Sequence, residues 1–304
     1  MSLYLKHRPV TLEQIKGNEH IVSTLNSMLS KKEHPHVFLL HGETGCGKTS
    51  IGRIIVNMVG CVGSDYREVS SNDNRGIDTV REIIKNSSYL PLEGKCRVWL
   101  LDEVHKMTND AQNALLKILE DTPPHVYFIL CTTEPTKLIL AIRGRCSEFQ
   151  VKPLTETEMK GLLRGIVRSE GETLKGEIYD QIIQDSLGHP RNAIQTLEQV
   201  LNVEPEKRLE VAMRSAELQS QSIELCRALF NPRIKWDDVN VILLQLKQQD
   251  PEDIRRAVLG YCQAILLKSD NTRAGLVMEN FLEPTYVNGF PQLVFAAYST
   301  IKSK

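Results

Sequence analysis

The stretch Gly42-Glu43-Thr44-Gly45-Cys46-Gly47-Lys48-Thr49 matches the phosphate-loop pattern G-x-x-x-x-G-K-[ST] at every position. A short apolar run at Val37–His41 precedes it and is typical of a buried strand, and isoleucines recur after it at helical spacing. The pattern therefore predicts a strand, a glycine-rich turn and a helix start, and it disfavours a chance glycine-rich turn. In that setting the glycines let backbone N–H groups surround phosphate oxygens at the positive end of a helix dipole.

The loop also supplies side chains with distinct tasks. Lys48 is expected to reach the β- and γ-phosphates of a nucleotide, and Thr49 is expected to offer its hydroxyl to Mg²⁺. The residues expected to contact the nucleotide are the whole loop and the serine that follows it: Gly42, Glu43, Thr44, Gly45, Cys46, Gly47, Lys48, Thr49 and Ser50.

A second apolar strand, Arg97–Leu101, ends in the acidic pair Asp102-Glu103. The carboxyl end of a strand parallel to the first lies beside the phosphate loop, where α/β sheets bind ligands. We expect Asp102 to hold Mg²⁺ and Glu103 to orient or deprotonate an attacking water. A kinase would need no water-activating carboxylate there, so the pair favours hydrolysis. The alternative is an acidic turn after a strand, which is common for one carboxylate and less so for two.

Composition limits the class of protein. The chain has 304 residues, of which 41% are apolar and 25% charged, enough for two or three domains. No apolar run approaches the roughly 20 residues of a membrane span, and the amino-terminal residues do not resemble a signal peptide, so we expect no membrane partner. Seven cysteines without a C-x-x-C pair argue against a disulfide framework or a four-cysteine zinc site and predict a reducing cytoplasm. The net charge of −1 means that any DNA contact must be a local patch or a sum over several copies.

Strand and helix patterns alternate up to about residue 152, which predicts a mostly parallel sheet with helices on it. Beyond it the pattern is helical, first in a small lid and then in an all-α region. In the last region we take two apolar stripes as core, one at Val239, Ile242, Leu243 and Leu246 and one at Ala257, Val258, Tyr261, Ile265 and Leu266. The strands that we expect are Val37–His41, Tyr66–Ser70, Arg97–Leu101, Tyr127–Thr132 and Glu148–Val151.

Three more positions narrow the kind of nucleotide site. Thr132-Thr133 ends a central strand, where a hydroxyl can bond the γ-phosphate or the attacking water, or can simply belong to a turn. Arg145, in Arg143-Gly144-Arg145, is expected on the domain rim, either as a finger reaching a neighbouring subunit's γ-phosphate or as a solvated arginine. Arg191 follows Pro190 at a helix N-terminus, where a cation needs a partner, either nucleotide phosphate or a carboxylate such as Glu172 or Glu177.

With these residues in place, the chain resembles an ATPase subunit of a sliding-clamp loader of the AAA+ family, over roughly residues 3–200. The likeness extends to the bacterial tau/gamma subunit and to the small subunits of replication factor C, and this mixture is compatible with a phage or other divergent replication system. The segments that carry it are His7-Arg8-Pro9, Gly17–His20, Ser71–Asp78, Asp102–Met107, Leu115–Lys117, Thr132–Pro135 and Gly188–Leu197.

By that resemblance Thr133 is sensor 1, Arg145 the trans-acting finger and Arg191 the lid arginine, while Arg8 and Pro9 border the adenine pocket. Lys48, Glu103, Thr133 and Arg145 would then be the catalytic residues. This chain departs from the family pattern in two places. At Gly144 the family's finger motif has serine. After the helix that follows the phosphate loop, the family's bacterial members have a four-cysteine zinc module, whereas this chain has only Cys61 there, so no zinc is expected.

The resemblance implies an α/β AAA+ P-loop domain at 1–153, a helical lid at 154–204 and a helical collar at 205–304. It implies ATP and Mg²⁺ as cofactors, and as partners a sliding clamp, primer–template DNA and other loader subunits in a homo- or heteropentameric ring. The activity would be ATP-driven clamp loading in the cytoplasm of a bacterial or phage-infected cell. Two alternatives stay open, another AAA+ DNA-remodelling ATPase of the branch-migration type and a structural loader subunit that does not hydrolyse ATP.

Two contact surfaces are further hypotheses. Arg75 and Lys106, each near a helix start, are expected to meet DNA phosphates; the alternative is a salt-bridged arginine and a solvated lysine. Ser88-Tyr89-Leu90-Pro91 carries an exposed apolar pair suited to an apolar pocket on a clamp.

Overall fold

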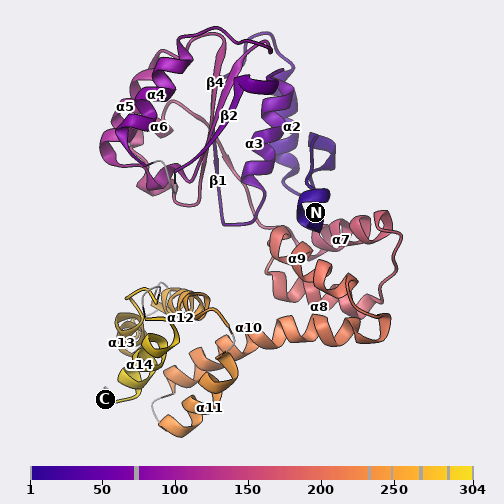
Figure 1. Ribbon diagram of the computed structural model, residues 1–304, viewed down its shortest axis with the longest axis vertical. Coiled ribbons are helices and arrows are strands. Elements are labelled where there is room, and N and C mark those ends of the chain that lie inside the picture. The colour runs from indigo at the N-terminus through magenta and orange to yellow at the C-terminus, as the bar shows by residue number, and fades with distance from the viewer. Residues whose placement is uncertain are drawn as a thin grey trace. The chain divides into compact units, whose positions relative to one another are not determined.

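The computed structural model describes residues 2–71, 75–231, 234–247, 249–266, 270–285 and 288–302, with side chains described in these ranges except at 214–223 and 264 (Figure 1). The chain divides into two units, Met1–Glu204 and Pro205–Lys304. No helix among the described residues combines the length and the apolar character needed to cross a membrane.

A five-stranded sheet organises the first unit. Its strands are β1 (Val37–His41), β2 (Tyr66–Ser70), β3 (Arg97–Asp102), β4 (Val126–Thr132) and β5 (Ser147–Gln150). Their order is β2-β3-β4-β1-β5, and every neighbouring pair is parallel. The predicted parallel sheet is therefore confirmed, and each expected strand end lies within one residue of the observed one.

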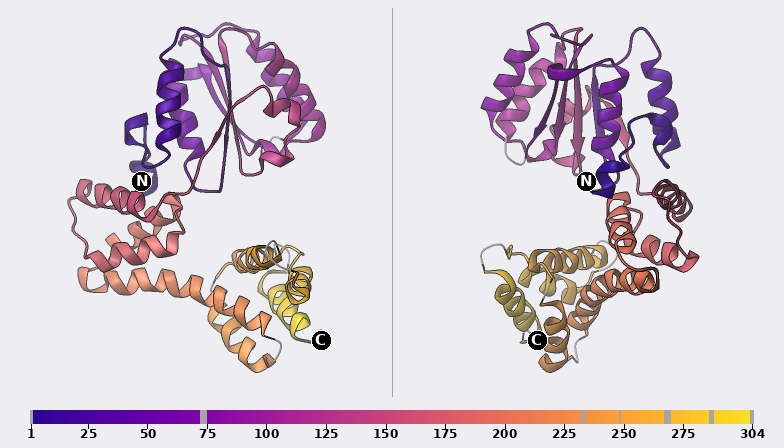
Figure 2. Two further views of the ribbon diagram at one scale, coloured as in Figure 1. Left: turned by 180° about the vertical axis from the view of Figure 1, so that it is seen from behind. Right: turned by 45° about the vertical axis from the view of Figure 1, so that its right-hand side comes forward.

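Helices cover both faces of this sheet, as Figures 1 and 2 show. One face carries α2 (Glu19–Leu29) and α3 (Lys48–Met58), and the other carries α4 (Ile77–Ser87), α5 (Asn109–Glu120) and α6 (Leu140–Arg143). Thr108 caps α5, because its side chain accepts from the N–H of Ala111. Short 3₁₀ turns connect the elements: η1 (Leu12–Gln14), η2 (Gly63–Asp65), η3 (Val104–Lys106) and η4 (Pro135–Lys137).

A buried carboxylate joins the loops at the base of the sheet. Asp65 has no exposed surface and accepts the N–H groups of Leu92, Glu93 and Gly94 at 2.7–2.9 Å. Its second partner is the Arg97 guanidinium at 3.5 Å. Burial alone would raise the pKa of Asp65, but these hydrogen bonds lower it to about 2. We call these residues the Asp65 cluster.

The segment predicted to be a helical lid, which we refer to as the lid, contains α7 (Glu156–Ser169), α8 (Gly176–Ser186) and α9 (Pro190–Leu201). Thr155 and Glu158 form a capping box at the start of α7, as the acidic first turn predicts. The short N-terminal helix α1 (Leu3–Lys6) is attached to this lid. The Leu3 N–H donates to Glu198 on α9 at 3.0 Å, and Lys6 pairs at 2.7 Å with Glu170, the residue that ends α7.

The second unit is helical throughout its described residues, with η5 (Pro205–Lys207), α10 (Arg208–Phe230), α11 (Trp236–Leu246), α12 (Pro251–Leu266), α13 (Thr272–Asn280) and α14 (Gly289–Lys302). All four residues of the predicted α11 stripe are buried.

The predicted stripe of α12 is wrong in part. Val258 is buried, but Ala257 and Leu266 are exposed, and the inner face carries Ile254 and Cys262 instead. The buried ion pair of Arg255 with Glu252 lies on the same turns and sets which face turns inward. The spacing of apolar residues in the sequence gives no sign of this buried ion pair.

Candidate active site

The phosphate loop has the backbone that its glycines permit. Gly42, Gly45 and Gly47 have φ values of 148°, 82° and 101°, in the region that favours glycine. A Cβ atom on Gly42 would also lie 2.1 Å from the carbonyl oxygen of Val151. The first loop position therefore requires glycine for two independent reasons.

Lys48 begins α3 beneath this loop, with its side chain buried. Its ammonium donates to the carbonyl oxygens of Gly42 at 2.9 Å and Glu43 at 2.7 Å. Burial lowers the pKa of Lys48. A buried cation whose partners are neutral carbonyls can exchange them for phosphate oxygens with a net gain in charge pairing.

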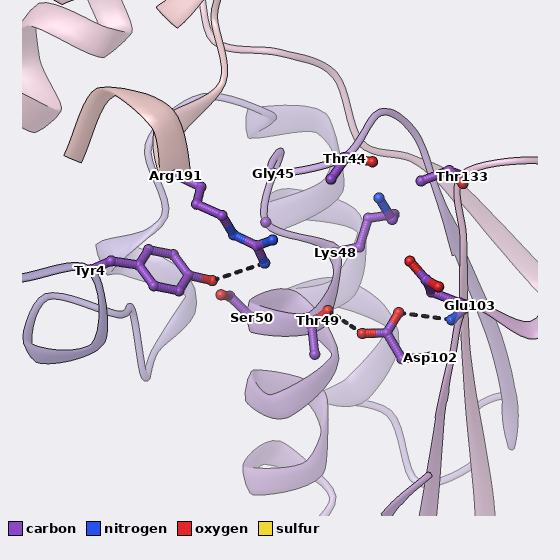
Figure 3. A pocket seen from close by; sticks show the side chains of 11 residues that line it. Tyr4, Thr44, Gly45, Lys48, Thr49, Ser50, Asp102, Glu103, Thr133 and Arg191 are labelled. Carbon is purple, nitrogen blue, oxygen red and sulfur yellow. Dashed lines mark hydrogen bonds between the residues drawn. The ribbon is translucent and has the colours of Figure 1, made fainter. Parts of the chain in front are cut away.

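Thr49 and Asp102 meet as the sequence predicts for a Mg²⁺ pair. The Thr49 hydroxyl donates to Oδ2 of Asp102 at 2.8 Å, and Oδ1 of Asp102 accepts the N–H of Glu103 at 2.9 Å (Figure 3). A hydroxyl and a carboxylate held together at the carboxyl edge of a parallel sheet are oxygen ligands of the kind that Mg²⁺ takes beside nucleotide phosphates. The residues present thus fit the metal.

Glu103 has a left-handed backbone, with φ of 54°. A non-glycine residue in this region carries strain, and such strain is often found at functional sites. Its carboxylate lines the pocket together with Lys48 and Thr133, and it forms an ion pair with Lys106. The alternative of a simply solvated lysine does not describe Lys106, because its ammonium, although 40% of the side chain is exposed, pairs with the candidate catalytic carboxylate.

The two threonines at the end of β4 differ in their surroundings. Thr132 is fully buried, and its hydroxyl is used by the ring of His105 and by the N–H of Glu134, both at 3.0 Å. Thr133 lines the pocket opposite the loop (Figure 3). Of the two, Thr133 is the one placed to meet a nucleotide.

Arg191 enters the pocket from the lid, and its partner is Tyr4 rather than Glu172 or Glu177. Its guanidinium donates to the Tyr4 hydroxyl at 3.4 Å and lies 5.2 Å from the centre of that ring (Figure 3). Burial opposes ionisation of Tyr4, but hydrogen bonds and charge from Arg191 and Arg8 outweigh it and lower the pKa of Tyr4. The buried Nε of Arg191 has no hydrogen-bond partner among the described residues, so the guanidinium keeps donor capacity for an anion.

A second cavity adjoins the loop and is mainly apolar. Arg8 and Pro9, the residues expected at the adenine pocket, line it together with Ile15, Ile51, Leu154 and Ile194. Arg8 lies 5.0 Å from the Tyr4 ring, on which Arg191 also packs. A nucleotide with its phosphates on the loop would find apolar walls for its base here.

Other candidate residues lie away from the pocket. Arg145 forms an ion pair with Glu120 at the end of α5 and donates to the carbonyl of Ala141 at 2.9 Å. Its neighbour Arg143 pairs at 2.8 Å with Glu148. The expected rim position agrees with this, whereas contact with a phosphate would need a neighbouring subunit.

The two candidate DNA residues lie near each other in the first unit, whereas the candidate clamp segment follows α4, at the opposite end of that helix from Arg75. The carbonyl of Arg75 accepts the N–H of Thr108 at 3.1 Å, which brings Arg75 to the segment that contains Lys106. Residues 72–74 of the quoted Ser71–Asp78 stretch lie outside the described residues. Tyr89 and Leu90 are 55% and 72% exposed, as expected for a docking pair.

Sequence reasoning missed Tyr4 and His189, which both contact the site. Tyr4 stands four residues before Arg8, the helical spacing at which side chains meet, so that signal was present. His189 contacts Cys46 of the loop through the packing of the lid, for which no local pattern exists.

Comparison with known proteins agrees with this geometry. The model of the family described as "DNA polymerase III, delta subunit" matches residues 63–155. The gamma/tau subunit of DNA polymerase III from Mycobacterium tuberculosis (strain H37Rv) is 33% identical over 224 residues, which cover 66% of this chain and 39% of that protein. The tau subunit from Bacillus subtilis is 33% identical over 222 residues, with the same coverage of 66% and 39%. The chain thus spans about two fifths of the length of these relatives.

Solved structures share the fold. The Holliday junction branch migration motor RuvB of Thermotoga maritima has a TM-score of 0.62 and 18% identity, covering 77% of this chain and 84% of that one. A gamma-subunit-related protein of DNA polymerase III from the same organism has a TM-score of 0.54 and 16% identity, covering 92% and 98%. At these identities the likeness concerns the fold alone.

Proposed function

Because the chain belongs to the clamp-loader family of AAA+ ATPases, we propose that it is an ATPase subunit of a DNA polymerase sliding-clamp loader. It would couple ATP binding and hydrolysis to loading of the clamp onto primer–template DNA. The observation that carries ATP hydrolysis is the hydrogen bond between Thr49 and Asp102, with Glu103 next to it in the same pocket. We place the activity in the cytoplasm of a bacterial or phage-infected cell, because the relatives are subunits of bacterial DNA polymerase III.

The roles of the residues follow from their positions. The loop N–H groups and Lys48 bind the β- and γ-phosphates, and Thr49 and Asp102 hold Mg²⁺, which when bound neutralises charge on those phosphates. Glu103 takes a proton from the attacking water, and Thr133 orients that water or the γ-phosphate. Arg191 contributes positive charge from the lid, and Arg8 and Pro9 border the base.

Hydrolysis would be completed by a neighbour in a ring. Arg145 is paired with Glu120 in its own chain, so in the assembly it would exchange this carboxylate for the γ-phosphate bound by the next subunit. Positive charge at that place stabilises the charge that develops in the transition state and contributes about 10³-fold or more in rate. We further propose the boundaries 1–153, 154–204 and 205–304 for nucleotide domain, lid and collar, with the collar joining the subunits.

The first experiment separates hydrolysis from binding. In the assembled loader, Glu103→Gln should retain ATP binding and lose phosphate release by about 10²-fold or more, because the water loses its base. Glu33→Gln, at an exposed surface position, is the matched control and should behave as wild type. If wild type and Glu103→Gln are equally inactive in the full assembly, the structural-subunit alternative holds.

The second experiment tests the alternative of a branch-migration ATPase. Phosphate release is measured with primer–template DNA, with DNA plus the cognate clamp, and with a four-way junction. A loader is stimulated by clamp plus DNA beyond DNA alone. Stimulation by the junction without an added effect of the clamp would favour the branch-migration motor.

The third experiment addresses the DNA surface. Replacing Arg75 and Lys106 by Ala should reduce the slope of log affinity against log salt by up to about 0.9 per lost phosphate contact. DNA binding is measured with ATPγS bound, so that loss of the ion pair between Lys106 and Glu103 cannot alter the result through a change in the rate of ATP hydrolysis. Replacing Lys31 and Lys32, which are also exposed, is the matched control. An unchanged slope would exclude the two residues as phosphate contacts.

The fourth experiment concerns the clamp. Tyr89→Ala with Leu90→Ala should abolish clamp pulldown and keep basal ATPase activity, because the exposed apolar pair is lost without a change at the pocket. Leu140→Ala removes an apolar side chain of similar exposure, 79%, and serves as the control. Retained pulldown in the double variant would rule out this docking segment.

A further inference from the structure

The imidazole of His189 lies between two side chains of the phosphate loop. Its Nδ1 is 3.5 Å from the Cys46 sulfur, and its Nε2 is 3.2 Å from a carboxylate oxygen of Glu43. The ring is 18% exposed, and Cys46 is buried. His189 belongs to the lid and directly precedes α9, so it joins lid and loop by side chains alone.

The three groups fit together in one protonation pattern. Burial raises the pKa of Cys46, so its sulfur keeps its proton and donates it to Nδ1. With the thiol as donor, Nδ1 accepts as the unprotonated nitrogen, and the hydrogen on Nε2 is directed at Glu43. Both ring nitrogens are used, so the ring orientation is fixed from both sides.

The backbone on either side of His189 is held firmly. Leu187 and Gly188 have φ values of 50° and 80°, and the Gly188 carbonyl accepts the N–H of Leu154 at 2.8 Å. A Cβ atom on Gly188 would lie 2.7 Å from the Leu154 carbonyl oxygen, so the turn at Gly188 packs closely against the backbone at Leu154, just before α7. Pro190 then starts α9 with a fixed φ. The ring of His189 therefore transmits the position of the loop to the first turn of α9.

That first turn carries Arg191, and it lies close to the loop backbone at Gly45. A Cβ atom on Gly45 would lie 3.5 Å from Cβ of Arg191 and 3.8 Å from Cβ of His189. Displacement of His189 would thus move Arg191 relative to the phosphates bound on the loop. Loop residue Glu43 is also the one whose carbonyl holds Lys48, so the contact reaches both cations of the pocket.

We propose that His189 is a positioning residue that docks the lid on the phosphate loop through Glu43 and Cys46 and holds Arg191 where the terminal phosphate of ATP binds. The inference rests on the nucleotide-binding function proposed above and adds to it the means by which the lid discriminates a triphosphate from a diphosphate. ADP offers no γ-phosphate to Arg191, so a displaced Arg191 weakens the binding of the triphosphate alone. The free energy of a hydrogen bond to a charged group is high enough that losing the bond weakens the affinity about tenfold or more.

The test is calorimetric titration of the full chain with ADP and with ATPγS, each with Mg²⁺. His189→Ala should weaken ATPγS about tenfold and leave ADP within about twofold. Arg191→Ala should show the same loss, and the double variant should be no weaker than Arg191→Ala alone, because the two residues act as one unit. His189→Gln, whose amide can donate to Glu43, should restore most of the ATPγS affinity.

A second variant, on the phosphate loop and not on the lid, makes the test independent of whether the lid still folds when His189 is replaced. Glu43→Ala removes a side chain that is 66% exposed and should reproduce the selective loss of ATPγS binding. Equal weakening of both nucleotides, or of neither, in His189→Ala and Glu43→Ala overturns the positioning role while nucleotide binding stands. If the wild-type chain binds neither nucleotide, or if Lys48→Ala binds both as well as wild type, it is the proposed function that fails.

Discussion

Removing the charge of Asp65 should destabilise the nucleotide-binding unit by about 3 kcal/mol. One of its oxygens accepts the N–H groups of Glu93 and Gly94 at 2.7 and 2.8 Å, and the other accepts from Leu92 at 2.8 Å. In Asp65→Asn, one of these oxygens becomes an NH₂ group that faces buried donors. If it replaces the first oxygen, two charge-assisted hydrogen bonds are lost, each worth about 1.5 kcal/mol or more.

Urea unfolding can follow this unit separately, because the two tryptophans of the chain lie in different units, Trp99 on β3 and Trp236 on α11. In a Trp236→Phe background, the fluorescence of Trp99 should report a midpoint lowered by about 1.5 M for a slope of about 2 kcal/mol per M. Asp78→Asn, at a carboxylate with 88% of its side chain exposed, is the matched control and should shift stability by less than about 0.5 kcal/mol.

The pH dependence gives a second measurement on the same pair of proteins. The pKa of Asp65 is about 2 in the folded chain and about 3.9 in an unfolded one, so its stabilisation is complete above pH 4 and is lost as the pH falls toward 2. The difference between wild type and Asp65→Asn should shrink over that range. A variant within about 0.5 kcal/mol of wild type at pH 7, or a difference that stays constant from pH 5 to pH 2, would refute the reasoning.

Three further predictions concern the loop, the lid and the finger. Gly42→Ala should abolish nucleotide binding and lower the melting temperature, because its Cβ would overlap the carbonyl of Val151; a normal melt with normal ADP binding would contradict this. Leu187→Gly should raise stability by about 0.5–1 kcal/mol in a thermal melt, since a left-handed C-cap favours glycine, and a loss of stability would count against strain at this turn. Glu120→Gln should raise the ATPase rate of the assembled loader by about two- to fivefold, because an exposed ion pair of about 0.5–1 kcal/mol no longer holds Arg145, and a lower rate would mean that Glu120 positions the finger instead.

Those parts of the fold that depend on short-range patterns could be predicted from the sequence. The three central strands β1, β3 and β4 are mainly apolar runs, and the phosphate loop and the acidic pair carry their chemistry in adjacent residues, so their meeting follows from a parallel sheet. Thr49 and Asp102 are 53 positions apart and still meet, because Thr49 lies in the first turn of the helix that follows β1 and Asp102 ends β3, both at the carboxyl edge of the parallel sheet.

The rest depends on packing that no local pattern encodes. Tyr4 meets Arg191 across 187 positions because α1 packs on the lid. In α12, a buried arginine–glutamate pair lies beside the apolar residues of the inner face, and hydropathy alone gives a stripe that is right at Val258 and wrong at Ala257 and Leu266.

The attachment of α1 to α7 and α9 has a consequence for how nucleotide enters and leaves. Arg8 and Pro9, which line the cavity proposed for the base, follow directly on a segment tied to the lid, so rotation of the lid would carry them with it. The cavity proposed for the base would then open in the same movement that withdraws Arg191 from the phosphates. Release of ADP would therefore require no second conformational change. A fluorescent label attached before Leu3 would move with the lid, and its signal would follow the rate of this opening.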